Sequence, residues 1–127
     1  MINGGDNIIK IKSYKFAIRT VELYKYLKSS KKEFILSRQI LRSGTSIGAN
    51  VEEVGANVEE AIGGQSKKDF ISKLSIAYKE SRETNYWVRI LKDTGYITEK
   101  EFDSIMLDLD EIQKLLVSIL KTSKSNV

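Results

Sequence analysis

Positively charged side chains are the residues of this sequence with the clearest chemical potential. The first fifty residues carry ten lysines and arginines against three acidic residues, within a chain whose net charge is +4. Such a surplus attracts the phosphate backbone of RNA or DNA, although a solvated, Lys-rich surface is the alternative interpretation. The residues that we predict to bind nucleic acid surround one expected turn: Lys25, Lys28, Lys31, Lys32, Arg38 and Arg42.

Aromatic residues do not interleave with these cations in the pattern typical of single-strand binding. We expect Tyr86 and Trp87, further along the chain, to lie in the core or a subunit interface. A second basic set lies in residues 66–95, where we expect mostly a solvated face with pairs such as Lys79–Glu83. This set consists of Lys67, Lys68, Lys73, Lys79, Arg82 and Arg89.

Many catalytic and metal chemistries are excluded by composition. The chain has 127 residues and contains neither Cys nor His. This excludes disulfides, thiolate metal sites, the Ser-His-Asp triad, the usual zinc sites and the Glu-x-x-His di-iron site. No spacing of serines, lysines or carboxylates singles out a catalytic pair. We therefore predict a protein that is not an enzyme, with no catalytic residues, no cofactor and no metal site.

Helical periodicity organises the chain into one domain. Apolar and small residues recur at spacings of three and four in four segments, and no segment shows the strict alternation of a strand. Connections of roughly 3–5 residues force neighbouring helices to run antiparallel. The predicted fold is all-α, an antiparallel up-down-up-down four-helix bundle. Within the single domain 1–127, we expect a loose N-terminus over 1–12, the bundle over 13–122 and a frayed tail over 123–127.

The four expected helices have recognisable ends. Ser13 is a plausible N-cap of a first helix that runs to about Ser29, with an apolar stripe from Phe16 to Leu27. The second helix is expected from about Glu33 to Ile62, and the third from Ser66 to the closing Gly95. The fourth begins with Thr98-Glu-Lys-Glu101, a full capping box. The predicted seams are Phe16, Ala17, Val21, Tyr24 and Leu27; Ile40, Gly44, Ile47, Val51, Val54, Val58 and Ala61; Phe70, Leu74, Ala77, Ser81, Thr84, Val88 and Leu91; and Phe102, Ile105, Leu109, Ile112, Leu116 and Ile119.

A tandem heptad lies within the expected second helix. Residues 48–54 read Gly-Ala-Asn-Val-Glu-Glu-Val, and residues 55–61 repeat six of these seven positions. Because seven residues are nearly two helical turns, the duplication would lengthen a continuous second helix while keeping Val54 and Val58 on its buried seam. The alternative backbone is one in which a copy loops out, with Gly55-Ala-Asn57 in an exposed bulge or turn. A separate functional alternative is an acidic repeat that binds a cation or a basic partner through Glu52, Glu53, Glu59 and Glu60.

Two glycines of the second helix also predict a close contact. Gly44 and Gly48 each cost about 1 kcal/mol of helix propensity relative to Ala, so they suggest that another backbone approaches there. A local break of the helix over 43–46 is the alternative. The expected first helix is about 25 Å long against about 45 Å for the second and third. This predicts an exposed part of the long pair that a second subunit would cover.

The chain shows neither the apolar core of a secretory signal nor a stretch long enough to span a membrane. We therefore expect a cytoplasmic protein that does not bind a membrane.

Five short motifs in a fixed order resemble a known bacterial family, the 23S rRNA intervening-sequence proteins, which are related to the accessory variability protein of diversity-generating retroelements. The resemblance implies a four-helix bundle assembled into a homopentameric ring, nucleic-acid binding through a basic surface and, in the retroelement relatives, contact with a reverse transcriptase. This chain departs from the family in carrying the heptad twice. The motifs are Arg38-Gln-Ile-Leu-Arg42, Ser46-Ile-Gly-Ala-Asn-Val-Glu-Glu53, Gln65-Ser-Lys-Lys-Asp-Phe70, Ile76-Ala-Tyr-Lys-Glu-Ser-Arg-Glu83 and Gly95-Tyr-Ile97.

Two functions follow as hypotheses. The first is a non-enzymatic oligomer that binds RNA or DNA, or that serves as an accessory to a nucleic-acid enzyme or another protein partner. The second is a protein-interaction or structural module with no nucleic-acid role. Binding that weakens steeply with salt would distinguish the first from the second.

Overall fold

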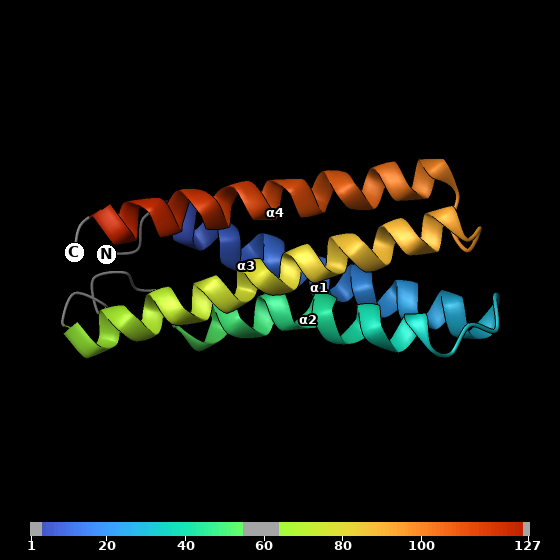
Figure 1. The fold of residues 1–127 in the computed structure, drawn as a ribbon, viewed down its shortest axis with the longest axis horizontal. Coiled ribbons are helices and arrows are strands. Elements are labelled where there is room, and N and C mark those ends of the chain that lie inside the picture. Colours follow the sequence, from blue (N-terminus) through green and yellow to red (C-terminus); the bar gives the residue numbers. More distant parts are fainter. Residues whose placement is uncertain (1–3, 55–63, 126–127) are drawn as a thin grey trace.

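The protein is an antiparallel bundle of four long helices. The computed structural model describes residues 4–54 and 64–125, and within these residues it contains helices and no strand. Each helix packs against its neighbours in sequence, and α1 also packs against α4, which closes the bundle (Figure 1). The predicted all-α, up-down-up-down fold is confirmed. The helices are α1 (Gly4–Ser29), α2 (Leu36–Glu53), α3 (Gly64–Asp93) and α4 (Glu99–Ser125).

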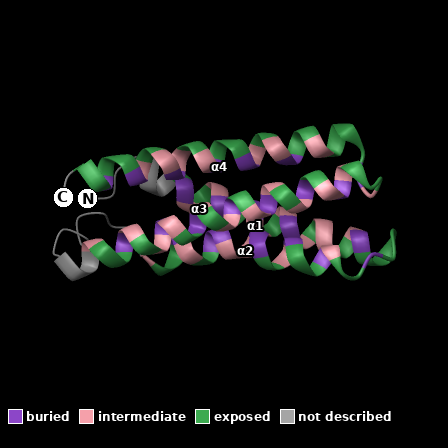
Figure 2. Ribbon diagram, in the orientation of Figure 1, coloured by how far each residue is buried: buried purple, intermediate pink, exposed green. Residues whose placement is uncertain are grey.

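Heptad seams bury the core along the bundle axis. All seven predicted seam residues of α3, from Phe70 to Leu91, are buried. On α4, Phe102 and Ile119 are only half-buried, although they pack against the core. Buried positions face inward on every helix and exposed positions face outward (Figure 2). The other predicted seam residues that are buried are Phe16, Leu27, Ile40, Gly44, Ile47, Val51, Ile105, Leu109, Ile112 and Leu116.

The first helix is longer than predicted. It begins at Gly4, so residues 4–12 are helical and the expected loose N-terminus is wrong there, while residues 1–3 lie outside the described part. Ser13 is no N-cap, because it is fully buried in the middle of α1. The buried seam of α1 includes the polar residues Ser13 and Thr20. The predicted seam members Ala17, Val21 and Tyr24 are only half-buried. The seam repeats at spacings of four and three: Ile9, Ser13, Phe16, Thr20, Leu23 and Leu27.

The second helix is shorter than predicted at both ends. It begins at Leu36 because the Glu33 side chain caps it, and it ends at Glu53 with Val54 as its C-cap. The prediction that α2 continues unbroken to Ile62 is therefore wrong, since the helix ends before the second heptad copy begins. The expected burial of Val58 falls on residues outside the described part.

The lengths of the helices also reverse one expectation. With 26 residues α1 spans about 39 Å, whereas α2 with 18 residues spans about 27 Å. The first helix is thus not the short one, and the argument for a second subunit from its shortness is wrong. At the other end of the chain, α4 runs to Ser125 and buries Ser123, so the tail is helical further than predicted.

The fourth helix starts as its sequence predicts. Glu101 Oε1 accepts a hydrogen bond from the backbone N–H of Thr98 at 2.7 Å. Thr98 Oγ1 accepts one from the backbone N–H of Glu101 at 3.1 Å. This is the reciprocal capping box that satisfies two otherwise unpaired donors.

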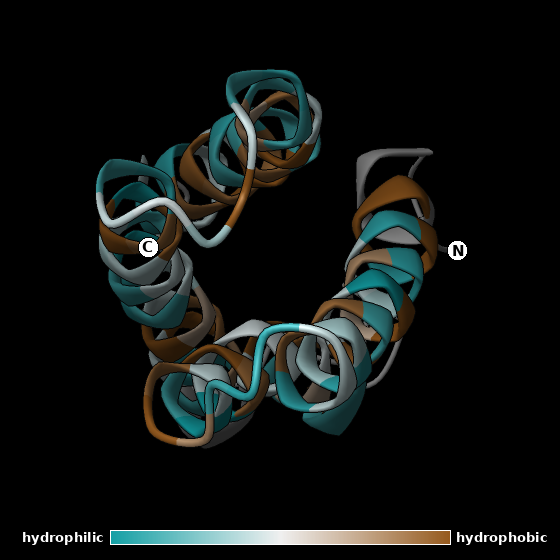
Figure 3. Cartoon of the chain, turned by 90° about the vertical axis from the view of Figure 1, so that its right-hand side faces the viewer, coloured by the Kyte–Doolittle hydropathy of each residue, from teal (hydrophilic) through white to brown (hydrophobic). Residues whose placement is uncertain are grey.

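Polar contacts join α1 to α4, whose ribbons lie further apart than those of the other neighbouring helices (Figure 3). The guanidinium of Arg19 donates to Asp108 Oδ2 at 2.7 Å and to the backbone and side-chain oxygens of Ser104. About two turns earlier on α1, Lys12 pairs with Glu111 at 3.2 Å. The α1–α4 contact is therefore held partly by charge rather than by close apolar packing alone.

Candidate nucleic-acid interface

Five of the six predicted phosphate-binding residues gather at one end of the bundle. Lys25 and Lys28 lie in the last turns of α1, Lys31 and Lys32 lie in the connection to α2, and Arg38 lies in the first turn of α2. All five are exposed. We call these five residues the basic tip. One helical hairpin carries all five.

The acidic residue of the connection is turned away from the basic tip. Glu33 is only 8% exposed, and its carboxylate accepts backbone N–H groups of Ile35, Leu36 and Ser37 at 3.2, 3.0 and 2.7 Å. This occupies the otherwise unpaired donors at the start of α2, where the helix dipole also favours negative charge. Because Glu33 caps α2, it does not pair with the lysines beside it.

Little else in the hairpin neutralises the tip. Lys25 lies 3.7 Å from Glu22, a loose pair between two well-exposed side chains. The other four cations form no ion pair with a residue that the structure describes. Their charges are available to solvent anions, and the tip is a positively charged surface.

Aromatic rings lie beside two lysines of the tip. The Nζ of Lys28 lies 4.9 Å from the ring centroid of Tyr24, and that of Lys31 lies 5.9 Å from the ring of Tyr26. Phe34, in the connection itself, is 47% exposed. The alternation of tyrosine and lysine in residues 24–28 was visible in the sequence, but only the hairpin geometry places the rings beside the amines.

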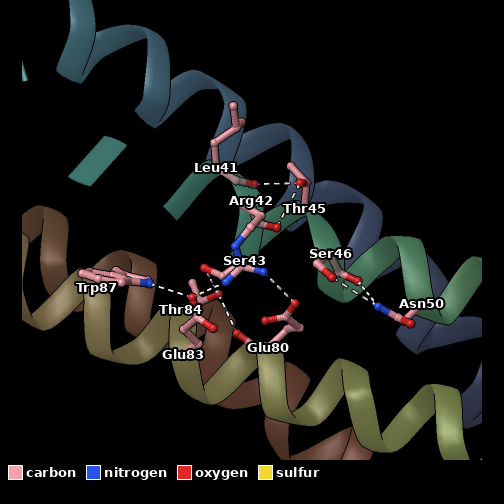
Figure 4. Close-up of polar contacts among 10 residues, drawn as sticks. All are labelled: Leu41, Arg42, Ser43, Thr45, Ser46, Asn50, Glu80, Glu83, Thr84 and Trp87. Atoms are coloured by element: carbon pink, nitrogen blue, oxygen red, sulfur yellow. Dashed lines mark hydrogen bonds and ion pairs between the residues drawn. The ribbon is translucent and has the colours of Figure 1, made fainter. Parts of the chain in front are cut away.

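Arg42 does not belong to the tip. Its guanidinium crosses to α3, where Nη1 donates to Glu80 Oε2 at 2.9 Å and Nη2 donates to Glu83 Oε2 (Figure 4). These hydrogen bonds raise the pKa of Arg42. The prediction that Arg42 is a free phosphate ligand is therefore wrong, because the guanidinium already donates hydrogen bonds to two carboxylates.

The same network fixes Trp87. Its indole Nε1 donates to Glu83 Oε2 at 3.0 Å. That hydrogen bond, followed by the one from Arg42, lowers the pKa of Glu83, so the carboxylate stays charged. Beneath the network, the hydroxyls of Ser43 and Thr84 join α2 to α3 by a buried hydrogen bond of 2.9 Å (Figure 4).

Comparison with known proteins places this geometry in a family. The family model described as 23S rRNA-intervening sequence protein matches residues 5–118, which is most of the chain. The chain belongs to this family. It is also similar to a crystal structure, at 1.70 Å resolution, of a protein of unknown function from the S23 ribosomal protein family of Bacteroides thetaiotaomicron. The two share 53% sequence identity with a TM-score of 0.83, covering 92% of this chain and 98% of that one. No curated protein matches the chain.

The acidic repeat of this 23S rRNA-intervening sequence family member does not build a cation site in its described half. Glu52 pairs with Lys10 at 3.7 Å, and Glu53 pairs with Lys73 at 3.0 Å. Glu59 and Glu60 lie outside the described residues. Among the residues that are described, no cluster of three acidic side chains could hold a metal ion.

Within residues 4–54 and 64–125, no helix is both long and apolar enough to cross a membrane.

Proposed function

We propose that this protein is a non-enzymatic, oligomeric nucleic-acid-binding or accessory protein that contacts the phosphate backbone through its basic tip. The observation that carries the proposal is the capping of α2 by Glu33. It leaves Lys28, Lys31, Lys32 and Arg38 without an acidic partner among the described residues, on a compact, exposed end of the bundle. Surfaces of this kind bind phosphates by releasing counterions.

We also propose that the active form is a homo-oligomer, and the family resemblance suggests a ring of five subunits. An apolar stripe on α1 supports an oligomer. Ile11, Tyr14 and Ile18 follow a spacing of three and four on the face opposite the α1 seam, and all three are exposed. A second copy of the chain would remove this stripe from water.

The oligomer has a direct test. Light scattering coupled to gel filtration should give several subunit masses at micromolar concentration, and Ile18→Lys should reduce the mass. Ile35, exposed at the N-cap position of α2, provides the matched control, because Ile35→Lys should leave the mass unchanged. A mass of one subunit for the unmodified protein would overturn the oligomer.

A salt titration tests the nucleic-acid function. Structured RNA and duplex DNA are titrated with protein of known oligomeric mass at several salt concentrations. We expect the logarithm of the binding constant to fall linearly with the logarithm of the salt concentration. Failure to bind either nucleic acid at low salt would favour the second candidate, a protein-interaction module. That candidate is supported by the same α1 stripe, and its partners would include a reverse transcriptase or another protein.

A further inference from the structure

A groove on α3 and α4 lies away from the basic tip and has the chemistry of a different nucleic-acid contact. We propose that this groove binds a single-stranded segment of RNA or DNA, with a base stacked on Tyr86 and phosphates bound by Arg82 and Arg89. The proposal rests on the proposed function and extends it, because it names the form of nucleic acid that a second surface would take.

The groove is open and mostly polar. Its volume is about 630 Å³, within the range of ligand sites. Residues of α3 line most of it, and Gln113 of α4 adds an amide on the far wall. The residues that supply charge and aromatic surface are Tyr78, Lys79, Arg82, Tyr86 and Arg89.

The positive charge of the groove is left uncompensated by the network described above. Glu83 is the one acidic residue of its lining, and its carboxylate is taken up by Arg42 and by the indole of Trp87. The expected Lys79–Glu83 pair therefore does not form. Lys79, Arg82 and Arg89 make no ion pair with any residue in the described ranges. Arg42 thus neutralises α3 on its α2 side and leaves three free cations on its groove side.

The aromatic ring of Tyr86 is restrained by contacts with neighbouring side chains. It is 49% exposed and meets Trp87 edge-on, with ring centroids 5.1 Å apart and planes 69° apart. Trp87 is itself held by its hydrogen bond to Glu83 and packs against the core. The guanidinium of Arg89 lies 5.8 Å from the Tyr86 centroid and is oriented by a 2.9 Å hydrogen bond from its Nε to Asn85 Oδ1. The half-exposed Tyr86 ring is therefore contacted both by the edge-on Trp87 ring and by the Arg89 guanidinium.

This combination favours an unpaired strand over other anionic ligands. Stacking on an aromatic ring requires a base whose face is open, which a single strand offers and a duplex does not. The amide of Gln113 can donate to and accept from base edges. Carboxylates of an acidic peptide would pair with the three cations but would not stack on the face of the Tyr86 ring.

Trp87 is the chain's single tryptophan, so its fluorescence reports on the groove. A 12-nucleotide oligouridine is titrated into the full chain at low salt while Trp87 emission and the anisotropy of a labelled copy are followed. We expect saturable quenching whose midpoint matches the anisotropy. Tyr86→Ala should weaken binding at least about fivefold, the lower end of what stacking of one base contributes. Tyr86→Phe should retain the affinity, because it keeps the ring.

Further variants separate this surface from the tip. Arg82→Ala should flatten the single-strand salt slope by about 0.7, the value for one lost phosphate contact. Leu107→Ala, which removes an exposed apolar side chain from α4 outside the groove, serves as the control and should change nothing. The double variant Lys31→Ala/Lys32→Ala should weaken binding of duplex RNA while leaving Trp87 quenching by oligouridine intact.

Two results would overturn the groove proposal alone. In one, oligouridine binds without changing Trp87 emission, and Tyr86→Ala behaves like Leu107→Ala. In the other, a polyglutamate peptide quenches Trp87 whereas oligouridine does not, which would identify the groove as a site for acidic peptides. Absence of binding to every RNA and DNA at low salt would be a different failure, because it would overturn the proposed function together with the groove.

Discussion

Gly44 of α2 lies directly against Thr20 of α1: a Cβ at position 44 would come within 2.6 Å of both Cγ2 and Oγ1 of Thr20. One helical turn later, a Cβ on Gly48 would lie 3.1 Å from the carbonyl oxygen of Ser13. The pair of glycines therefore lets α1 and α2 approach closely within one subunit. This confirms the predicted close approach and rules out the alternative of a broken helix, since α2 is continuous through both residues.

Gly44→Ala should destabilise the protein by about 1–3 kcal/mol, the usual cost of overpacking a core. Thr20 cannot move aside easily, because it is buried and its hydroxyl donates to the Phe16 carbonyl at 2.8 Å. Urea denaturation measures the change. The double variant Thr20→Ala/Gly44→Ala removes both 2.6 Å contacts and leaves only the 3.1 Å approach to the Cβ of residue 20. It should recover part of the stability lost in Gly44→Ala, whereas additive losses would contradict a contact between the two residues.

Glu33→Ala should cost about 1–2 kcal/mol of stability, because three N–H groups at the start of α2 lose their acceptor. Glu33→Gln keeps one acceptor oxygen and should lose less. Glu22→Ala, in the same hairpin but well exposed, is the control and should lie within about 0.5 kcal/mol of the unmodified protein. Equal effects of Glu33→Ala and Glu22→Ala would contradict the capping role.

Arg38 and Arg42 stand one turn apart on α2 yet should respond in opposite ways. Arg42→Ala should lower stability by about 1 kcal/mol through loss of its pairs with Glu80 and Glu83, with little change in the salt slope for RNA. Arg38→Ala should leave stability unchanged and flatten the slope for duplex by up to ~0.9. Denaturation and salt titration of the two variants decide the matter, and the reverse pattern would return Arg42 to the tip.

Acid should weaken the contribution of Glu83 to stability. Its pKa is lowered in the folded protein by hydrogen bonds from Trp87 and then Arg42, so the unfolded chain binds protons more readily. The stabilisation is full above the ordinary value of 4.5 and is lost as the pH falls through the lowered one. The stability of Glu83→Gln should therefore fall less between pH 5 and the acid limit than that of the unmodified protein. Parallel pH profiles would contradict this.

The sequence predicted α3 and α4 well because apolar or small residues occupy nearly every seam position, and because a capping box marks the start of α4. It predicted α1 poorly for two physical reasons. Ser13 and Thr20 occupy buried seam positions opposite the glycines of α2, where small residues fit. A second apolar stripe, with Tyr14 and Ile18, runs along the opposite face and obscures the period of the first.

The candidate site divides in the same way. The gathering of Lys28, Lys31 and Arg38 was predictable because one turn joins them. The pairing of Arg42 with Glu80 and Glu83 was not predictable from the sequence. These partners lie 38 and 41 residues away, and the contact depends on the register of α2 against α3. The burial of the Glu33 carboxylate likewise depends on the backbone geometry at the start of α2, which no sequence motif predicts.

The salt dependence of RNA binding in the unmodified protein and in a tip variant tests the central proposal most directly. The variant Lys28→Ala/Lys31→Ala/Lys32→Ala removes three exposed cations and should leave the bundle folded and its oligomeric mass unchanged. For a structured RNA, the plot of log binding constant against log salt should be linear, and the variant should flatten its slope by up to ~2.7, at about 0.9 for each phosphate contact on duplex. An identical slope in the variant, or no binding by the unmodified protein at low salt, would contradict the account.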